Sequence, residues 1–390
     1  ILPHQSALAA ELLQAAKPRE LSILLVLGDV QASCQSLVQM RAAGAHRVWI
    51  EVTDADQLDT CTSEPDGYVL KGHEAGGFVG EDTAYILLQK ALKRTHRPVL
   101  VRGGVGVHTT AAVRLAGAAG IVLDDQCLLL KESPLSTERK NALARLNGGE
   151  TRLLGEHLQT TARVFAAPRH PLWTDVESLE QAAETDARAS QLWSAKLRPL
   201  IGWDEATQLA PLGQGIGVAN CVQTYRTVGR LIQAIRKQSQ ADIELAARQA
   251  ALSPQAPLAV SHGTRYPVVQ GPMTRVSDTA EFACKVAEGG GLPMLALALM
   301  RGQQVSALLE QTRDQIAGKP WGIGLLGFVP QQLREEQTRA VLACKPTFAL
   351  IAGGRPDQAA HFESEGIPAY IHAPAPALLK MYLEQGAHRF

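Results

Sequence analysis

Short apolar runs alternate with longer amphipathic stretches in two parts of the chain, a rhythm that predicts βα units around parallel sheets. In the first part, the runs that we predict to be strands are 22–27, 48–52, 67–70, 98–101 and 120–123. In the second part, they are 267–270, 292–297, 321–328, 347–352 and 369–372. Each part therefore supplies five βα steps.

The pattern changes between these parts, over residues 134–261. Strand-like runs are missing there, and helix-like stretches cover residues 179–197 and 222–250. We expect a helical appendage and linker. The glycine-rich stretch 211–217 follows no predicted strand, so a loop between helices is favoured over a phosphate-binding loop.

The two strand-rich parts echo each other. A tetrapeptide ending in Gly44 precedes one predicted strand, and one ending in Gly366 precedes its counterpart. The distance along the chain between these two segments is too long for a solenoid repeat, and it agrees with the length of a whole barrel with an appendage. Both ends of the chain are expected to be cut from something longer.

The predicted fold class is α/β, of the TIM-barrel (β/α)8 type with a helical insert. We expect residues 1–133 to be the C-terminal part of a first barrel and residues 262–390 the N-terminal part of a second. The strands of the two copies could pair into one permuted barrel, which would cover their edges. The alternative is two separate barrels, each incomplete.

Composition excludes several classes of partner. Lys and Arg balance Asp and Glu at 38 each, so no net field attracts nucleic acid or an anionic membrane. No apolar run reaches the ~18 residues that span a bilayer. The six cysteines lack disulfide or metal spacing, which favours reduced thiols. We expect a soluble, cytoplasmic protein without a metal site or a membrane span.

Two glycine-rich turns follow predicted strands, where barrel active sites lie. Residues 71–80 contain Gly76 and Gly77, which would let backbone approach a flat ligand, although a tight βα turn explains them equally well. Residues 102–106 contain Gly103 and Gly104 and open a predicted helix, whose N-terminus favours a phosphate.

These motifs carry a family resemblance. The run 67–133 resembles the second half of nitronate monooxygenases (2-nitropropane dioxygenase-like proteins) and of the related FMN-dependent enoyl reductases. Residues 267–273 resemble the opening strand of that family, whose end contacts the flavin ring, and residues 320–326 resemble its third strand. The front-half motifs follow the back-half motifs, which agrees with tandem copies.

The resemblance implies an FMN-dependent oxidoreductase. Hydride would pass from NADH or NADPH to the flavin and then to an unsaturated acyl chain, or the flavin would oxidise a nitronate with oxygen. The implied flavin contacts are Gln270, Gly271, Pro272, Met273, Gly76, Gly77, Gly103 and Gly104.

The sequence departs from the family pattern at three places, which are Phe78, the Asp124-Asp125 pair and Gly324. Phe78 stands where many members have a histidine that acts as a base, and a phenyl ring takes no proton. His73 is a weak catalytic candidate, because an exposed turn histidine is the simpler interpretation. Asp124 and Asp125 replace a Gly-Thr pair and would repel a phosphate unless Arg102 intervened; two solvated surface acids are the alternative.

In the second copy, Gly324 stands where the family often has an asparagine, which removes one donor near the flavin.

The paired units, with residues 132–135 and 353–358 as they stand, are similar to the N-terminal region of type I polyketide synthases of the polyunsaturated fatty acid and glycolipid type. The resemblance implies a small-molecule or carrier-bound acyl substrate and the other domains of a synthase as partners. The rival interpretation is a catalytically silent barrel that acts as a scaffold or docking module. A sugar-phosphate barrel ranks last, since it does not account for the Gln-Gly-Pro-Met run.

Overall fold

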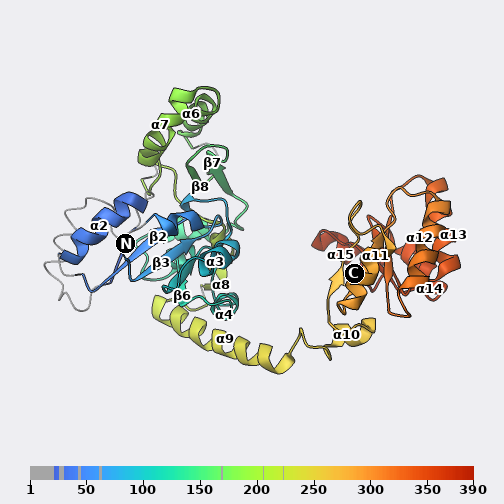
Figure 1. The fold of residues 1–390 in the computed structure, drawn as a ribbon. Helices are drawn as coiled ribbons and strands as arrows, with labels where there is room; N and C mark the ends of the chain where they lie inside the picture. Colours follow the sequence, from blue (N-terminus) through green and yellow to red (C-terminus); the bar gives the residue numbers. More distant parts are fainter. Residues whose placement is uncertain are drawn as a thin grey trace. The chain divides into compact units, whose positions relative to one another are not determined.

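The computed structural model describes residues 22–25, 30–42, 45–60, 64–167, 170–204, 206–222 and 224–390. They form two compact units, the first ending at Leu245 and the second beginning at Ala246 (Figure 1). Residues 134–245 therefore fold with the first sheet. Each unit is described by itself below.

Unit 1 is built on a five-stranded sheet in which all neighbours are parallel, in the order β1-β2-β3-β5-β6. The strands are β1 (Ser22–Leu25), β2 (Arg47–Val52), β3 (Gly67–Lys71), β5 (Val99–Arg102) and β6 (Gly120–Val122). Every residue of β3 is buried, as expected of a central parallel strand covered on both faces.

Helices connect these strands as the sequence predicts. They are α2 (Val30–Ala42), the 3-10 helix η1 (Ala55–Asp59), α3 (Ala84–Leu92) and α4 (Thr110–Leu115). The buried face of α3 carries Leu87, Leu88 and Ala91, which belong to one apolar core with Leu70 of β3 and Val101 of β5. Burial of these aliphatic side chains, at about 25 cal/mol per Å² of apolar surface, holds the helix on the sheet.

The prediction that strands are missing from residues 134–261 is wrong. Strands β7 (Thr151–Leu154) and β8 (Thr161–Phe165) form an antiparallel pair, and β4 (Gly77–Val79) adds to the other side of β8. The central three residues of β8 are buried. This small sheet joins the appendage to the glycine-rich turn at the end of β3, a long-range pairing that no local pattern reveals.

The rest of the appendage is helical. It contains α5 (Thr137–Leu143), α6 (Trp173–Thr185), α7 (Ala187–Leu197), η3 (Arg198–Leu200), η4 (Gln214–Val218), α8 (Ala219–Val222) and α9 (Val228–Gln249), and it follows the 3-10 helix η2 (Asp125–Leu129), which comes directly after β6. The stretch predicted as one helix over 179–197 is two, because Asp186 has an extended backbone and caps α7 through the N–H of Ala189. In Figure 1, α6 and α7 lie side by side next to β7 and β8.

Unit 2 opens with α10 (Pro257–His262) and is built on a parallel sheet in the order β13-β12-β11-β10-β9. The strands are β9 (Val269–Gln270), β10 (Leu292–Ala296), β11 (Gly322–Leu326), β12 (Phe348–Ala352) and β13 (Ala369–Ile371). The helices that alternate with them are α11 (Ala280–Glu288), α12 (Gly302–Gln315), α13 (Gln331–Cys344), α14 (Pro356–Ser364) and α15 (Pro376–Glu384). All five predicted strands are present.

The α/β class with parallel sheets is confirmed, whereas a complete barrel is not. No ladder joins the two five-stranded sheets within the described residues, so a single permuted barrel stays a prediction. Among these residues, no helix is long and apolar enough to cross a membrane, and no group of three or more His, Cys, Asp or Glu side chains could hold a metal ion.

The cysteines agree only in part with the expected reduced thiols. Cys127, Cys284 and Cys344 are free, whereas Cys34 is disulfide-bonded, so the expectation is wrong for that residue. The side chains of Cys61 and Cys221 lie outside the described part of the chain.

Candidate functional site

A cluster of charged side chains lies at the carboxyl ends of the strands of unit 1. Glu51 of β2 is its centre, since one carboxylate oxygen accepts a hydrogen bond from Arg102 of β5 at 2.6 Å. The other oxygen lies 3.6 Å from Lys71 Nζ of β3. Arg102 Nε lies 3.5 Å from Asp124, which follows β6. Parallel strands place these residues at one edge of the sheet.

The cluster is nearly closed to solvent. The Glu51 and Lys71 side chains are only 6% and 5% exposed. Burial lowers the pKa of Lys71, and the attraction of Glu51 opposes that shift. Buried charges are tolerated when they are paired, so each cation here depends on the Glu51 carboxylate.

Asp125 is buried beside this cluster, which corrects the interpretation of Asp124 and Asp125 as solvated surface acids. Its carboxylate accepts a hydrogen bond from the backbone N–H of Gly213 at 3.2 Å. Burial, reinforced by the neighbouring Asp124 carboxylate, raises the pKa of Asp125 to about 7. A backbone N–H of the glycine-rich stretch 211–217 thus binds a carboxylate of the chain itself.

The four glycines proposed for the first copy lie close to one another, but against other parts of the chain. A Cβ added to Gly76 would lie 2.2 Å from the carbonyl oxygen of Pro211. At Gly103 it would lie 3.3 Å from Ala75 Cβ, and at Gly104 3.2 Å from Glu74 Cγ. The close approaches that require glycine are therefore made by residues 74–75 and 211–213, so this site does not fit a flavin.

The space that remains there is small. A cavity of about 90 Å³ adjoins Gly104 and Gly106, far below the ~300–1,000 Å³ of ligand sites. Polar groups at the start of α4 are already hydrogen-bonded to one another. The Gly106 N–H donates to Thr109 Oγ1 at 3.0 Å, and the Thr110 hydroxyl donates to the Gly106 carbonyl at 2.6 Å. The immediate surroundings of Gly104 and Gly106 therefore offer neither the volume nor the free donors that a flavin phosphate needs.

His73 and Phe78 are both engaged within unit 1. His73 Nδ1 lies 2.8 Å from the carbonyl oxygen of Gly80, within the turn that contains both residues. Phe78 packs against the core of the appendage, and the guanidinium of Arg198 lies 5.0 Å from the centre of its ring. Phe78 therefore faces the appendage.

In unit 2, the predicted flavin contacts lie at the end of β9 and directly after it. The Gln270 side chain is fixed at the end of β9, because its amide oxygen accepts the Met294 N–H at 3.2 Å and its amide nitrogen donates to the Met294 carbonyl at 3.3 Å. A Cβ added to Gly271 would meet no atom within 4 Å. The backbone after β9 is thus anchored on one side and open on the other.

Pro272 and Gly324 are in close contact across this edge. A Cβ at Gly324 would lie 2.3 Å from Pro272 Cβ, which explains in steric terms why no asparagine stands there. Met273 follows, with its backbone N–H donating to the fully buried Ser277 hydroxyl at 2.7 Å.

Apolar side chains are exposed after the strands of unit 2. Met273 follows β9, Leu299 follows β10 and Phe328 follows β11, with 43%, 70% and 72% of their surfaces exposed. Large apolar side chains gathered at one edge are typical of a ligand or partner surface.

Sequence reasoning missed Glu51, Lys71 and Glu74. A signal existed for the first two, since each is a charged residue within or at the end of an otherwise apolar strand run. Glu74, whose carboxylate accepts the Ala84 N–H at the start of α3, has no such signal.

Comparisons with known proteins give limited similarity. No protein-family model matches the chain, and no curated protein matches it. The chain is similar in structure to FabK from Thermotoga maritima, with 19% identity, a TM-score of 0.49, and coverage of 63% of this chain and 77% of that one. It is also similar to nitroalkane oxidase from Streptomyces ansochromogenes, with 21% identity, a TM-score of 0.42, and coverage of 61% and 68%. A third similar structure is the enoyl reductase domain of MlnA from the macrolactin biosynthesis cluster of Bacillus amyloliquefaciens, with 12% identity, a TM-score of 0.43, and coverage of 64% and 82%. None of these likenesses assigns a ligand or a residue role to this chain.

Proposed function

We propose that the chain is part of an FMN-dependent oxidoreductase of the nitronate monooxygenase or enoyl reductase type, with the flavin ring lying against residues 270–273 of unit 2. The observation that carries this proposal is the edge after β9. There Gln270 is fixed by both polar groups of Met294, while the next residue, Gly271, has open space on its Cβ side.

Each residue of the Gln-Gly-Pro-Met run has a distinct role in the proposal. Gln270 fixes the backbone, Gly271 lets a flat ring approach it, and Met273 offers an exposed thioether as an apolar contact. Bound FMN would supply a ring that accepts hydride from NADH or NADPH and passes it to an unsaturated acyl group, or that oxidises a nitronate. The protein's part is to hold that ring in place and keep its face dry.

The second candidate function is a catalytically silent scaffold, and unit 1 favours it. The chain's own residues 74–75 and 211–213 lie against the glycines that would cradle a flavin. Asp125 places a carboxylate where the resemblance puts a phosphate, and Phe78 cannot accept a proton. We propose that unit 1 binds no flavin and serves a structural role beside other domains of a synthase that carries acyl substrates.

A titration with FMN tests the proposal. We expect the full chain to bind one equivalent of FMN, with a shift of the visible flavin bands. Gly271→Val would place a branched side chain in the open space and should abolish binding. Gly229→Val is the matched control, because a Cβ there also meets no atom within 4 Å. A bound flavin would then be tested for reduction by NADH and by NADPH.

Two outcomes would overturn the proposal. If a folded chain binds no FMN, the scaffold is the better account of both units. If Gly271→Val and the wild type bind equally well, the flavin lies elsewhere. Binding of two equivalents would contradict a silent unit 1.

A further inference from the structure

A cavity of about 430 Å³ lies in unit 2 between α13 and α14, above the ends of β11 and β12. Its volume falls within the ~300–1,000 Å³ typical of small-molecule sites. It lies among the helices that follow the strands and is lined by neither Gln270 nor Met273. Its occupant is therefore a question separate from the flavin.

The floor and one wall of the cavity are apolar. Leu325 and Ile351 come from the strands and Phe362 from α14, and all three are buried. Leu342 of α13 adds a partly buried side chain. Such a surface releases water when an apolar group covers it.

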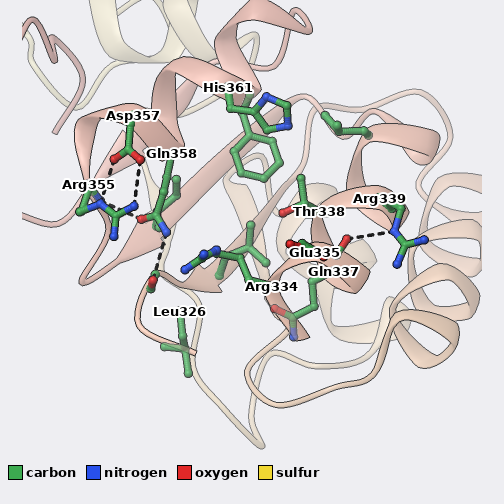
Figure 2. A pocket seen from close by; sticks show the side chains of 15 residues that line it. Leu326, Arg334, Glu335, Gln337, Thr338, Arg339, Arg355, Asp357, Gln358 and His361 are labelled. Carbon is green, nitrogen blue, oxygen red and sulfur yellow. Dashed lines mark hydrogen bonds and ion pairs between the residues drawn. The ribbon is translucent and has the colours of Figure 1, made fainter. Parts of the chain in front are cut away.

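Most polar groups around the cavity are already used. The Gln358 amide oxygen accepts the Arg355 N–H at 2.9 Å, and its nitrogen donates to the Gly327 carbonyl at 3.1 Å. Arg355 pairs with Asp357 at 2.9 Å, and Arg339 Nε donates to the Glu335 carbonyl at 3.4 Å. Figure 2 shows these contacts at the rim.

Arg334 differs from Arg339 and Arg355, the other two arginines that line the cavity. Figure 2 shows its side chain lying in the space between the α13 and α14 residues, and it is half-buried there. Within the part of the chain that the structure describes, its guanidinium forms no ion pair and no hydrogen bond. A guanidinium stays charged at all ordinary pH values, so this position holds a positive charge without a counter-charge of its own.

We propose that this cavity binds a small amphiphilic anion, with its carboxylate or phosphate on Arg334 and its apolar body over Leu325 and Phe362. The planar fork of a guanidinium matches two anionic oxygens of either head group. Thr338 lines the same wall and has a hydroxyl available as a second donor.

Titration calorimetry with defined probes tests this site in the full chain. Octanoate and octyl phosphate carry the two head groups on the same tail, while octanol lacks the charge and inorganic phosphate lacks the tail. We expect both amphiphilic anions to bind at least about tenfold more tightly than octanol. The stronger of the two identifies the natural head group.

Variants distinguish an Arg334 site from general adhesion to the cavity. Arg334→Gln should weaken octanoate and octyl phosphate about tenfold or more, and Arg334→Lys should weaken them less. Arg339→Gln is the matched control, as it removes an exposed arginine from the same lining, and should leave both affinities unchanged. Circular dichroism and FMN titration of each variant show whether unit 2 remains folded.

Equal affinity of wild type and Arg334→Gln for octanoate would overturn the proposal. So would octanol binding as tightly as octanoate, or the absence of binding by any probe. Because the FMN titration is a separate readout, failure of this site and failure of the flavin site are distinguishable.

Discussion

The side-chain carboxylate of Asp125 accepts a hydrogen bond from the backbone N–H of Gly213, 88 residues further along the chain, at 3.2 Å. Glycine is required at this approach, because a Cβ at Gly213 would lie 2.6 Å from the second carboxylate oxygen. The contact ties the glycine-rich stretch 211–217 to the residues that follow β6. The appendage therefore covers the carboxyl ends of the strands of unit 1.

The ionisation of Asp125 should make the stability of unit 1 depend on pH. Burial and Asp124 raise its folded-state pKa to about 7 from an ordinary 3.8, so the folded state binds this proton more tightly than the unfolded state. The free energy of unfolding should then fall as the pH rises from about 4 to about 7. Asp125→Asn is neutral throughout and keeps an acceptor for Gly213. Its stability relative to wild type should increase by on the order of 2 kcal/mol between pH 5 and pH 8.

Urea denaturation of both proteins at pH 5, 6, 7 and 8 measures this difference. Asp204→Asn is a useful control, since that carboxylate is exposed. Parallel pH curves for the wild type and Asp125→Asn would show that Asp125 is ionised in the folded protein across the whole range.

Glu51 should be the most sensitive residue of the buried charge cluster. Glu51→Gln removes the carboxylate that faces both Lys71 and Arg102 and leaves two cations without their main partner. We expect a loss of about 3–5 kcal/mol in the free energy of unfolding. Glu177→Gln removes another arginine partner, but at a side chain that is 54% exposed, and should change stability little. Similar losses in the two variants, measured by urea denaturation, would contradict a special role for burial at Glu51.

The central strands of the parallel sheets, such as β3, β10 and β11, could be predicted because nearly all of their residues are buried and they form short apolar runs. Residues 348–352 of β12, Phe-Ala-Leu-Ile-Ala, contain no polar side chain, and the predicted run 347–352 matches them closely. Glycine or proline residues beside the neighbouring helices indicated where those helices begin or end. The local sequence was sufficient to predict a strand wherever that strand's own residues are buried.

The small sheet and the closed edge of unit 1 could not be predicted in this way. Strand β4 is three residues within a glycine-rich turn, and it exists because Phe78 pairs with Ala162 of β8. Asp125 resembled a surface acid because its partner, Gly213, belongs to a distant loop. Both features depend on contacts between segments far apart in the sequence. In unit 2, by contrast, the Gln-Gly-Pro-Met run was recognised from its own residues, and its role as a flavin contact stays a prediction.

Introducing an asparagine at position 324 should damage unit 2. In Gly324→Asn, the new Cβ would overlap Pro272, whose Cβ and Cγ would lie 2.3 and 2.4 Å away. We expect a loss of about 1–3 kcal/mol and a displacement of the edge after β9. Gly366→Asn is the control, because it has open space and a left-handed φ of 83° that asparagine tolerates. If thermal melts show equal stability for Gly324→Asn and the wild type, Pro272 can move, and the edge is not rigid.

Introducing a histidine at position 78 should not create a catalytic base in unit 1. The Phe78 side chain packs on the core of the appendage with the Arg198 guanidinium 5.0 Å from its ring, so an imidazole would enter the same environment. A neighbouring cation disfavours protonation, and the smaller, polar ring loses apolar contact. We expect Phe78→His to lower the free energy of unfolding by about 1–2 kcal/mol. Phe78→Leu, which stays apolar, should lose less of the free energy of unfolding.

Nitronate oxidation in the presence of FMN should be no faster in Phe78→His than in wild type. A gain in that rate would mean that position 78 can reach a substrate, and it would argue against a silent unit 1.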